Sequence, residues 1–216
     1  MLPSTLHAAV LVLTLSGGCA LALAGDPPGA KEKAAGSHPH AVIATSMRTF
    51  EIELYPADAP KTVENFMGLA RKKYFNGMRF HRVVKGFVIQ TGDEKSKDTA
   101  LINEWGTGGK SIWGGTFADE LNPNAPSYKN GYKKGVVAMA NAGPNTNTSQ
   151  FFVMLQDNTT LPRHYTIFGK VVKGMEVVEK IGEVEVVPPG ASDGRPKTDV
   201  MMTSVSIMPA AKGVKK

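Results

Sequence analysis

Cysteine and clustered metal-binding side chains are scarce in this sequence. Its 216 residues include a single cysteine, Cys19, which excludes an intramolecular disulfide. His81 and His164 lack partners at metal-ligand spacing. His38 and His40 stand in a stretch rich in Pro and Gly, where two histidines alone do not give the fixed geometry that a metal site requires. We therefore expect no disulfide, no metal site and no cofactor.

Two other kinds of catalytic site are also unsupported. The segment 106–111, GTGGKS, partly matches the motif of a phosphate-binding loop, but that motif requires a glycine at the position of Glu104. Ser111 and Ser149 lie in stretches rich in Gly or Asn, without the turn signature of a nucleophilic serine. Nucleotide hydrolysis is therefore rejected, and serine-nucleophile chemistry has no support in the sequence.

Acidic residues are in modest deficit, with 19 Asp and Glu against 25 Lys and Arg and a net charge of +6. Much of the excess lies near the ends of the chain, at Lys31, Lys33, Lys212, Lys215 and Lys216. A diffuse excess of this kind is more typical of solubility than of nucleic-acid binding. The cluster 71–73, RKK, could contact phosphate, but it closes a predicted helix, where cations suit the dipole. We expect no nucleic-acid partner.

One long apolar run is present, at residues 6–24, and it ends in Ala22-Leu23-Ala24. This ending is typical of a signal-peptidase site, which predicts export to the periplasm or cell envelope and a mature chain that starts near Gly25. Two alternatives stay open. Cys19 follows Leu15 at nearly the spacing of a lipoprotein signal, which would attach the chain to a membrane through Cys19. An uncleaved membrane anchor is the other alternative.

The rest of the chain predicts a single folded domain between two tails. Residues 25–40 are rich in Pro, Gly and Ala and predict a flexible linker, residues 41–209 predict the domain, and residues 210–216 form a basic tail. Strands are indicated at 41–46, 49–55, 80–93, 135–140, 150–155, 165–172, 183–187 and 200–208.

Two helices are indicated. The first opens at 58–60, where Asp58 can cap it and Pro60 suits its first turn, and the second covers 174–181. Short strands with only two helices favour a mainly β fold, a closed β-barrel, over alternating βαβ units. Residues 92–125 have little periodicity and predict long ordered loops, which tend to carry function.

The segment 80–93, FHRVVKGFVIQTGD, is the strongest candidate for a functional site. It places Arg82 beside apolar residues of a predicted strand. A charge in such surroundings is costly unless it has a partner, so the position calls for a functional explanation. A structural ion pair is the alternative explanation for Arg82.

Four segments together resemble the signature blocks of the cyclophilin family of peptidyl-prolyl cis-trans isomerases. They are FHRVVKGFVIQTGD (80–93), GTGGKSI (106–112), VVAMANAGPNTNTSQFF (136–152) and YTIFGKVVKGMEVVEKI (165–181). The resemblance extends in order from about residue 41 to residue 208. It implies a closed eight-stranded antiparallel β-barrel capped by two α-helices, monomeric and without a cofactor, with a shallow groove that binds proline-containing polypeptides.

The resemblance also implies roles for individual residues. Arg82 would be the catalytic arginine, Phe87, Phe152 and Leu161 would line a proline pocket, and Gln90 and Asn141 would hold the peptide backbone. The substrate-binding residues implied in this way are His81, Phe87, Val88, Gln90, Gly106, Ala140, Asn141, Gln150, Phe152, Leu161 and Tyr165. Taken singly, the apolar members could be core residues, and Gln90 and Asn141 could merely satisfy backbone groups of loops.

The sequence departs from the common family pattern at several positions. Val88 stands where many members have Met, and Thr160 stands where an aromatic residue is frequent, which implies reduced sensitivity to cyclosporin. Tyr165 occupies the place of a frequent histidine, a pattern that resembles exported bacterial-type members. The segment 93–106 is longer than usual, which is expected to extend the rim of the groove.

The implied reaction suits these residue types. Rotation about a peptide bond has a barrier of roughly 18–20 kcal/mol because of amide resonance, and it breaks no bond. An arginine can donate a hydrogen bond to the prolyl nitrogen, whose lone pair becomes available only in the twisted state. The rival hypothesis is a chaperone or scaffold module that binds proline peptides without turnover. The retention of Arg82 favours the enzyme, assisting protein folding in the cell envelope.

Overall fold

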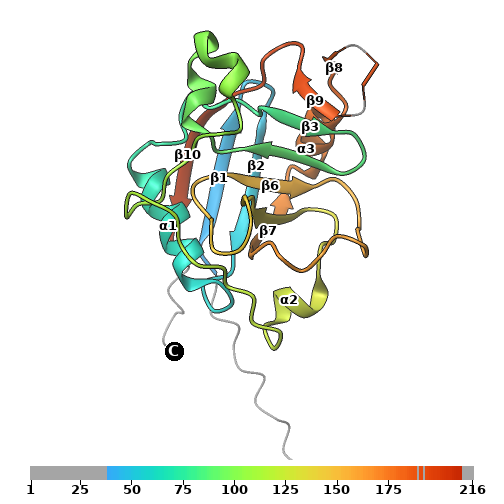
Figure 1. The fold of residues 1–216 in the computed structure, drawn as a ribbon. Helices are drawn as coiled ribbons and strands as arrows, with labels where there is room; N and C mark the ends of the chain where they lie inside the picture. Colours follow the sequence, from blue (N-terminus) through green and yellow to red (C-terminus); the bar gives the residue numbers. More distant parts are fainter. Residues whose placement is uncertain (1–37, 189, 192, 211–216) are drawn as a thin grey trace, which may run out of the picture. The chain divides into compact units, whose positions relative to one another are not determined.

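The computed structural model describes residues 38–188, 190–191 and 193–210 (Figure 1). The predicted signal segment, Cys19, most of the linker and all but the first residue of the basic tail lie outside the described residues. None of the helices in the described part is long and apolar enough to cross a membrane.

Antiparallel strands form the framework of the molecule. Within the described residues the strands are β1 (His40–Thr45), β2 (Thr49–Leu54), β3 (Arg82–Val84), β4 (Val88–Thr91), β5 (Val136–Met139), β6 (Phe151–Met154), β7 (Ile167–Lys173), β8 (Val186–Val187), β9 (Asp193–Pro196) and β10 (Met202–Met208). The helices described are α1 (Pro60–Arg71), α2 (Pro126–Asn130) and α3 (Met175–Gly182), with 3-10 helices η1 (Glu94–Lys97) and η2 (Thr99–Glu104). The mainly β fold, the β1–β2 hairpin and the two longer helices agree with the sequence analysis.

The sheet differs from the expected closed eight-stranded barrel. Its strands follow the order β10-β1-β2-β7-β5-β6-β4-β3-β9-β8, so the described ladder has ten strands and two free ends. Backbone bonds nevertheless join two distant parts of the sheet, from Phe80 N to Val200 O at 2.9 Å and from Met202 N to Met78 O at 2.8 Å. Figure 1 shows β3 and β6 passing in front of β2.

Two local features account for the additional strands. The segment 80–93, expected as one strand, is a hairpin, because the chain reverses at Gly86 with a φ of 68° that favours glycine. The second feature is β9, which forms in a segment rich in turn residues and pairs with β3. The reversal is marked in the sequence only by Lys85-Gly86 between two apolar runs, and β9, with the sequence DGRP, has no apolar alternation that would predict a strand.

The main core is built around aromatic rings. Phe66 of α1 lies 5.1 Å from Phe75, 5.6 Å from Phe151 and 5.4 Å from Phe168 between ring centroids, and all four side chains are buried. Such pairs add roughly 0.5–1.5 kcal/mol each beyond the burial of their area. Phe152, the neighbour of Phe151 on β6, belongs to a second apolar cluster. Successive side chains of a strand point to opposite faces, so β6 joins the core to this second cluster.

Helix α1 begins differently from the prediction. Its N-cap is Ala59, without a side-chain cap, and Asp58 instead accepts a hydrogen bond from Ser127 N at 2.8 Å. The open end of the helix is satisfied by Glu120, whose carboxylate accepts from Lys61 N at 3.0 Å and Thr62 N at 2.8 Å. The cap is therefore supplied from a distant loop, which connects the 92–125 region to the core helix.

Replacing Glu120 by Ala should lower the free energy of unfolding by about 1–2 kcal/mol, because two amide groups of the helix lose their acceptor and the helix dipole loses a favourable charge. Urea unfolding measures the effect. Glu64→Gln, on the exposed face of the same helix, is the matched control and should stay within about 0.5 kcal/mol of the wild type. Equal stability of Glu120→Ala and the control would contradict this role.

Candidate active site

The pairing register aligns three predicted site residues in one row across β3, β4 and β6, and the row continues to Ala138 of β5. Arg82 of β3 is opposite Gln90 of β4, Gln90 is opposite Phe152 of β6, and Phe152 is opposite Ala138 of β5. Residues directly opposite one another in an antiparallel ladder share a face of the sheet. The two halves of the site, which are distant in sequence, are therefore joined by backbone pairing.

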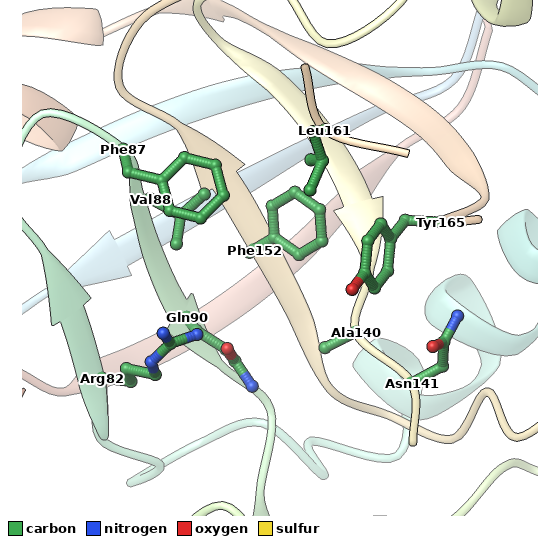
Figure 2. Close-up of a pocket in the computed structure, with 9 residues that line it drawn as sticks. All are labelled: Arg82, Phe87, Val88, Gln90, Ala140, Asn141, Phe152, Leu161 and Tyr165. Carbon is green, nitrogen blue, oxygen red and sulfur yellow. The ribbon is translucent and has the colours of Figure 1, made fainter. Parts of the chain in front are cut away.

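A groove of about 370 Å³ lies over this row (Figure 2). It is lined by Arg82, Phe87, Val88, Gln90, Ala140, Asn141, Phe152, Leu161 and Tyr165. All of these belong to the set that the sequence analysis assigned to the site. The volume is in the lower part of the range for small-ligand sites.

One end of the groove is apolar. Phe152 is the deepest ring, with 6% of its surface exposed, and it meets Tyr165 edge to face with 5.5 Å between ring centroids. Figure 2 shows Phe87, Val88 and Leu161 grouped near Phe152, away from Asn141. This end offers a water-poor surface suited to a small aliphatic ring.

The other end carries the cation. Arg82 is 43% exposed and pairs with Asp193 through two hydrogen bonds, from Nε to Oδ1 at 3.0 Å and from Nη2 to Oδ2 at 2.6 Å. Asp193 belongs to β9, and the sequence analysis did not identify it. Nothing in its sequence context, a stretch rich in turn residues, distinguishes it from an ordinary loop aspartate.

Gln90 is oriented by a chain of hydrogen bonds. Gln150 donates from Nε2 to Gly106 O at 2.9 Å and to Gly108 O at 2.7 Å, and both carbonyl oxygens can only accept. The Oε1 atom of Gln150 is therefore left to accept from Gln90 Nε2, at 3.0 Å. As a result, Gln90 keeps its own carbonyl oxygen available as an acceptor.

A second groove, of about 610 Å³, adjoins the first and shares Gln90, Ala140 and Asn141 with it. Gly106 and Gln150, two further predicted site residues, line only this second groove. An extended polypeptide could therefore contact both grooves at once.

Asn141 has a partner within its own loop region. Its Nδ2 donates to His164 O at 2.9 Å, and its Oδ1 accepts from Gly143 N at 3.3 Å. The side chain thus satisfies loop backbone groups, as one of the two interpretations of the sequence proposed. It still lies at the wall of both grooves.

His81 is the predicted site residue that lines neither groove. It is 7% exposed and lies behind Gly106, where a Cβ atom would come within 3.4 Å of the imidazole ring. Among the described residues its two ring nitrogens have no hydrogen-bond partner. Burial lowers the pKa of His81 to about 4, against an opposing effect of Asp93. The imidazole is therefore neutral at pH 7.

The long segment between Asp93 and Gly106 supports the glycine loop from behind. Asp93 is fully buried and accepts from Lys95 N at 2.9 Å and from Gly106 N at 2.5 Å, so one carboxylate joins η1 to the loop. The same segment is held by Arg79, which lies 5.3 Å from the ring of Trp105. Residues 94–105 line neither groove, which corrects the expectation that they extend its rim.

No group of three or more His, Cys, Asp or Glu side chains in the described part of the chain could hold a metal ion. The first groove offers the guanidinium of Arg82, the amide side chains of Gln90 and Asn141, the hydroxyl of Tyr165 and an apolar surface.

Comparisons with known proteins identify the fold and the family. A family model described as "Cyclophilin type peptidyl-prolyl cis-trans isomerase/CLD" matches residues 40–207. Peptidyl-prolyl cis-trans isomerase-like 1 of Mus musculus is 44% identical over 162 residues, which cover 75% of this chain and 88% of that protein. Peptidyl-prolyl cis-trans isomerase CYP18-2 of Arabidopsis thaliana is 41% identical over 150 residues, or 69% of this chain and 84% of that one.

A longer relative and a solved structure complete the comparison. Peptidylprolyl isomerase domain and WD repeat-containing protein 1 of Mus musculus is 44% identical over 168 residues, but the chain spans only 23% of its length. The crystal structure of a cyclophilin type peptidyl-prolyl cis-trans isomerase from Cryptosporidium parvum has a TM-score of 0.67 and 30% identity, covering 78% of this chain and 96% of that one. The same protein was also solved in the presence of the dipeptide Ala-Pro.

Because His81 is buried and neutral, we expect the free energy of unfolding to fall in mild acid. Its pKa in the folded state, about 4, is below the ordinary value of 6.5, so the unfolded chain binds the proton more readily between these limits. Stability should therefore fall as the pH drops from 6.5 towards 4, and His81 should contribute about 2 kcal/mol of loss between pH 7.5 and pH 5. Urea unfolding at both pH values, on the wild type and His81→Gln, measures this contribution. An equal loss in the variant would refute it.

Proposed function

The chain belongs to the family of cyclophilin-type peptidyl-prolyl cis-trans isomerases, and we propose that it accelerates rotation about Xaa-Pro bonds in the groove shown in Figure 2. The observation that carries the proposal is the row from Arg82 through Gln90 to Phe152, which sets a guanidinium beside an apolar pocket. A proline would place its ring against Phe152 and its nitrogen towards Arg82.

The chemistry follows from what changes during rotation. In the planar amide the nitrogen lone pair is delocalised, whereas in the twisted state it becomes localised and can accept a hydrogen bond. Arg82 remains charged at all physiological pH values and has N–H groups to donate. A bond formed only in the twisted state lowers the barrier without tightening the binding of the planar substrate.

The apolar end of the groove strengthens this effect. With the proline ring against Phe152, Phe87 and Leu161, water is displaced and the guanidinium acts in a medium of lower dielectric constant. The amide side chain of Gln90, held by Gln150, is available to the peptide backbone. Binding of the flanking backbone fixes the substrate while the Xaa-Pro bond turns.

Arg82→Ala should reduce kcat/KM for a proline peptide by about 100-fold, because an electrostatic hydrogen bond to the transition state is lost, and should leave the fold intact. Exchange between the cis and trans forms of the peptide, followed by NMR with the full chain, measures the rate. Lys85→Ala, an exposed cation in the β3–β4 turn, is the matched control and should retain wild-type activity. A wild-type chain that binds the peptide without accelerating exchange would instead identify a binding module.

We further propose that the enzyme is an exported, bacterial-type member that acts as a monomer on folding proteins of the cell envelope. Support comes from the apolar run 6–24 with its Ala22-Leu23-Ala24 ending and from the Tyr165 pattern. Uncatalysed prolyl isomerisation takes tens of seconds or longer and can limit folding, so an isomerase in that compartment would be useful.

The processing of the N-terminus distinguishes the alternatives for export. Mass spectrometry of the chain purified from the cell envelope should show a mature protein that starts near Gly25. A lipid-modified Cys19 would identify a membrane-attached form instead. An intact chain starting at Met1 would contradict processing of either kind.

A further inference from the structure

We propose that Asp193 is a positioning residue for the reaction: it holds the guanidinium of Arg82 in the orientation that faces the groove before the substrate arrives. This inference rests on the proposed function, because it assigns Asp193 a role only through Arg82. Asp193 does not itself line the groove.

The geometry of the pair fixes the plane of the guanidinium. Asp193 occupies Nε and Nη2 of Arg82 at the same time, at 3.0 and 2.6 Å, in the two-pronged arrangement that matches a carboxylate to an arginine. Among the described residues, Nη1 of Arg82 makes no hydrogen bond. The edge that carries Nη1 is therefore the donor edge left for the substrate.

Asp193 is itself held by the sheet. It begins β9 and is paired with Val84, and the next residue, Gly194, is paired with Val83. Arg82 and Val84 share a face of β3, so Asp193 reaches Arg82 along the diagonal of the ladder. A Cβ atom at Gly194 would clash with Val187 O, which shows how closely β9 is packed against β8. The carboxylate is thus carried by a strand with neighbours on both sides.

Arg82 needs such a partner because it lies at an open rim. Its side chain is 43% exposed and has several rotatable bonds, so an unpaired guanidinium would sample many orientations in water. Its proposed hydrogen bond exists only in the twisted state of the substrate, and the cost of ordering Arg82 would then be added to the barrier. Prior pairing with Asp193 removes part of that cost, and this should appear in kcat rather than in KM.

A purely structural ion pair would behave differently. Asp193 is 45% exposed, and exposed pairs contribute little to stability. If the pair only joined β3 to β9, its loss would lower the melting temperature slightly and leave the turnover number unchanged.

The test compares Asp193→Asn with the wild type in the full chain, using the NMR exchange assay with a proline peptide. Asparagine keeps the size of the side chain but loses the charge and one acceptor. We expect kcat to fall roughly tenfold and KM to change by less than about twofold, since tight orientation of Arg82 is lost but the groove is intact. The matched control is Glu185→Gln, which removes an exposed ion pair with Lys197 at 3.0 Å near the same β8–β9 ribbon and should keep wild-type kcat.

The dependence of kcat on salt concentration is a second measurement. A purely structural role of the ion pair would leave kcat independent of salt. Because the Arg82–Asp193 pair is exposed, ions screen it, and the wild-type kcat should fall with rising salt towards the value of Asp193→Asn. The kcat of Asp193→Asn itself should depend only weakly on salt. In an Arg82→Ala background, adding Asp193→Asn should not lower kcat further. An active wild type with an equally active Asp193→Asn would overturn this inference alone. An inactive wild type would overturn the proposed function and this inference with it.

Discussion

The antiparallel pairing of β4 with β6 is the constraint on which the site depends. It sets Gln90 opposite Phe152, while the pairing of β3 with β4 sets Arg82 opposite Gln90. A slip of one residue between β4 and β6 would turn Phe152 into the core and Phe151 into the groove. The aromatic cluster around Phe66 opposes that slip, since it requires Phe151 on the core side. Packing on one face of the sheet therefore determines the geometry of the site on the other.

The polar half of the site is ordered by groups whose hydrogen-bonding roles are fixed. Backbone carbonyls of the glycine loop can only accept hydrogen bonds, so they fix the orientation of the Gln150 amide. Gln150 in turn fixes the orientation of the Gln90 amide. Asp193 likewise can only accept when ionised, and it sets the plane of Arg82. Preorganised donors need no reordering when the substrate twists, which is how electrostatic groups contribute most to catalysis. The apolar half needs no such network of side-chain hydrogen bonds, because Phe152 is positioned by the pairing of β6 with β4 and β5 and by packing.

The sequence predicts the parts of this molecule that have a strong local pattern. The hairpin of β1 and β2 and the apolar face of α1 are of this kind. The groove residues around Phe152 have no such local pattern and were identified only through the resemblance of several motifs, in order, to one family. Features that depend on tertiary contacts could not be predicted. Glu120 caps α1 from a distant loop, and Asp193 meets Arg82 through β9, a strand without an apolar pattern. The family resemblance implied that His81 lies in the groove, but alternation along the chain places its ring behind Gly106.

We propose that one groove, assembled from the β3–β4 hairpin and from β6, turns over Xaa-Pro bonds. The most direct test is an NMR titration of the full chain with a proline peptide, recording the protein amide shifts and the cis–trans exchange of the peptide in the same samples. We expect shift changes at Arg82, Gln90 and Phe152 together, with exchange accelerated at substoichiometric protein. Shift changes confined to another surface, or exchange that stays at the uncatalysed rate while these residues respond, would contradict it.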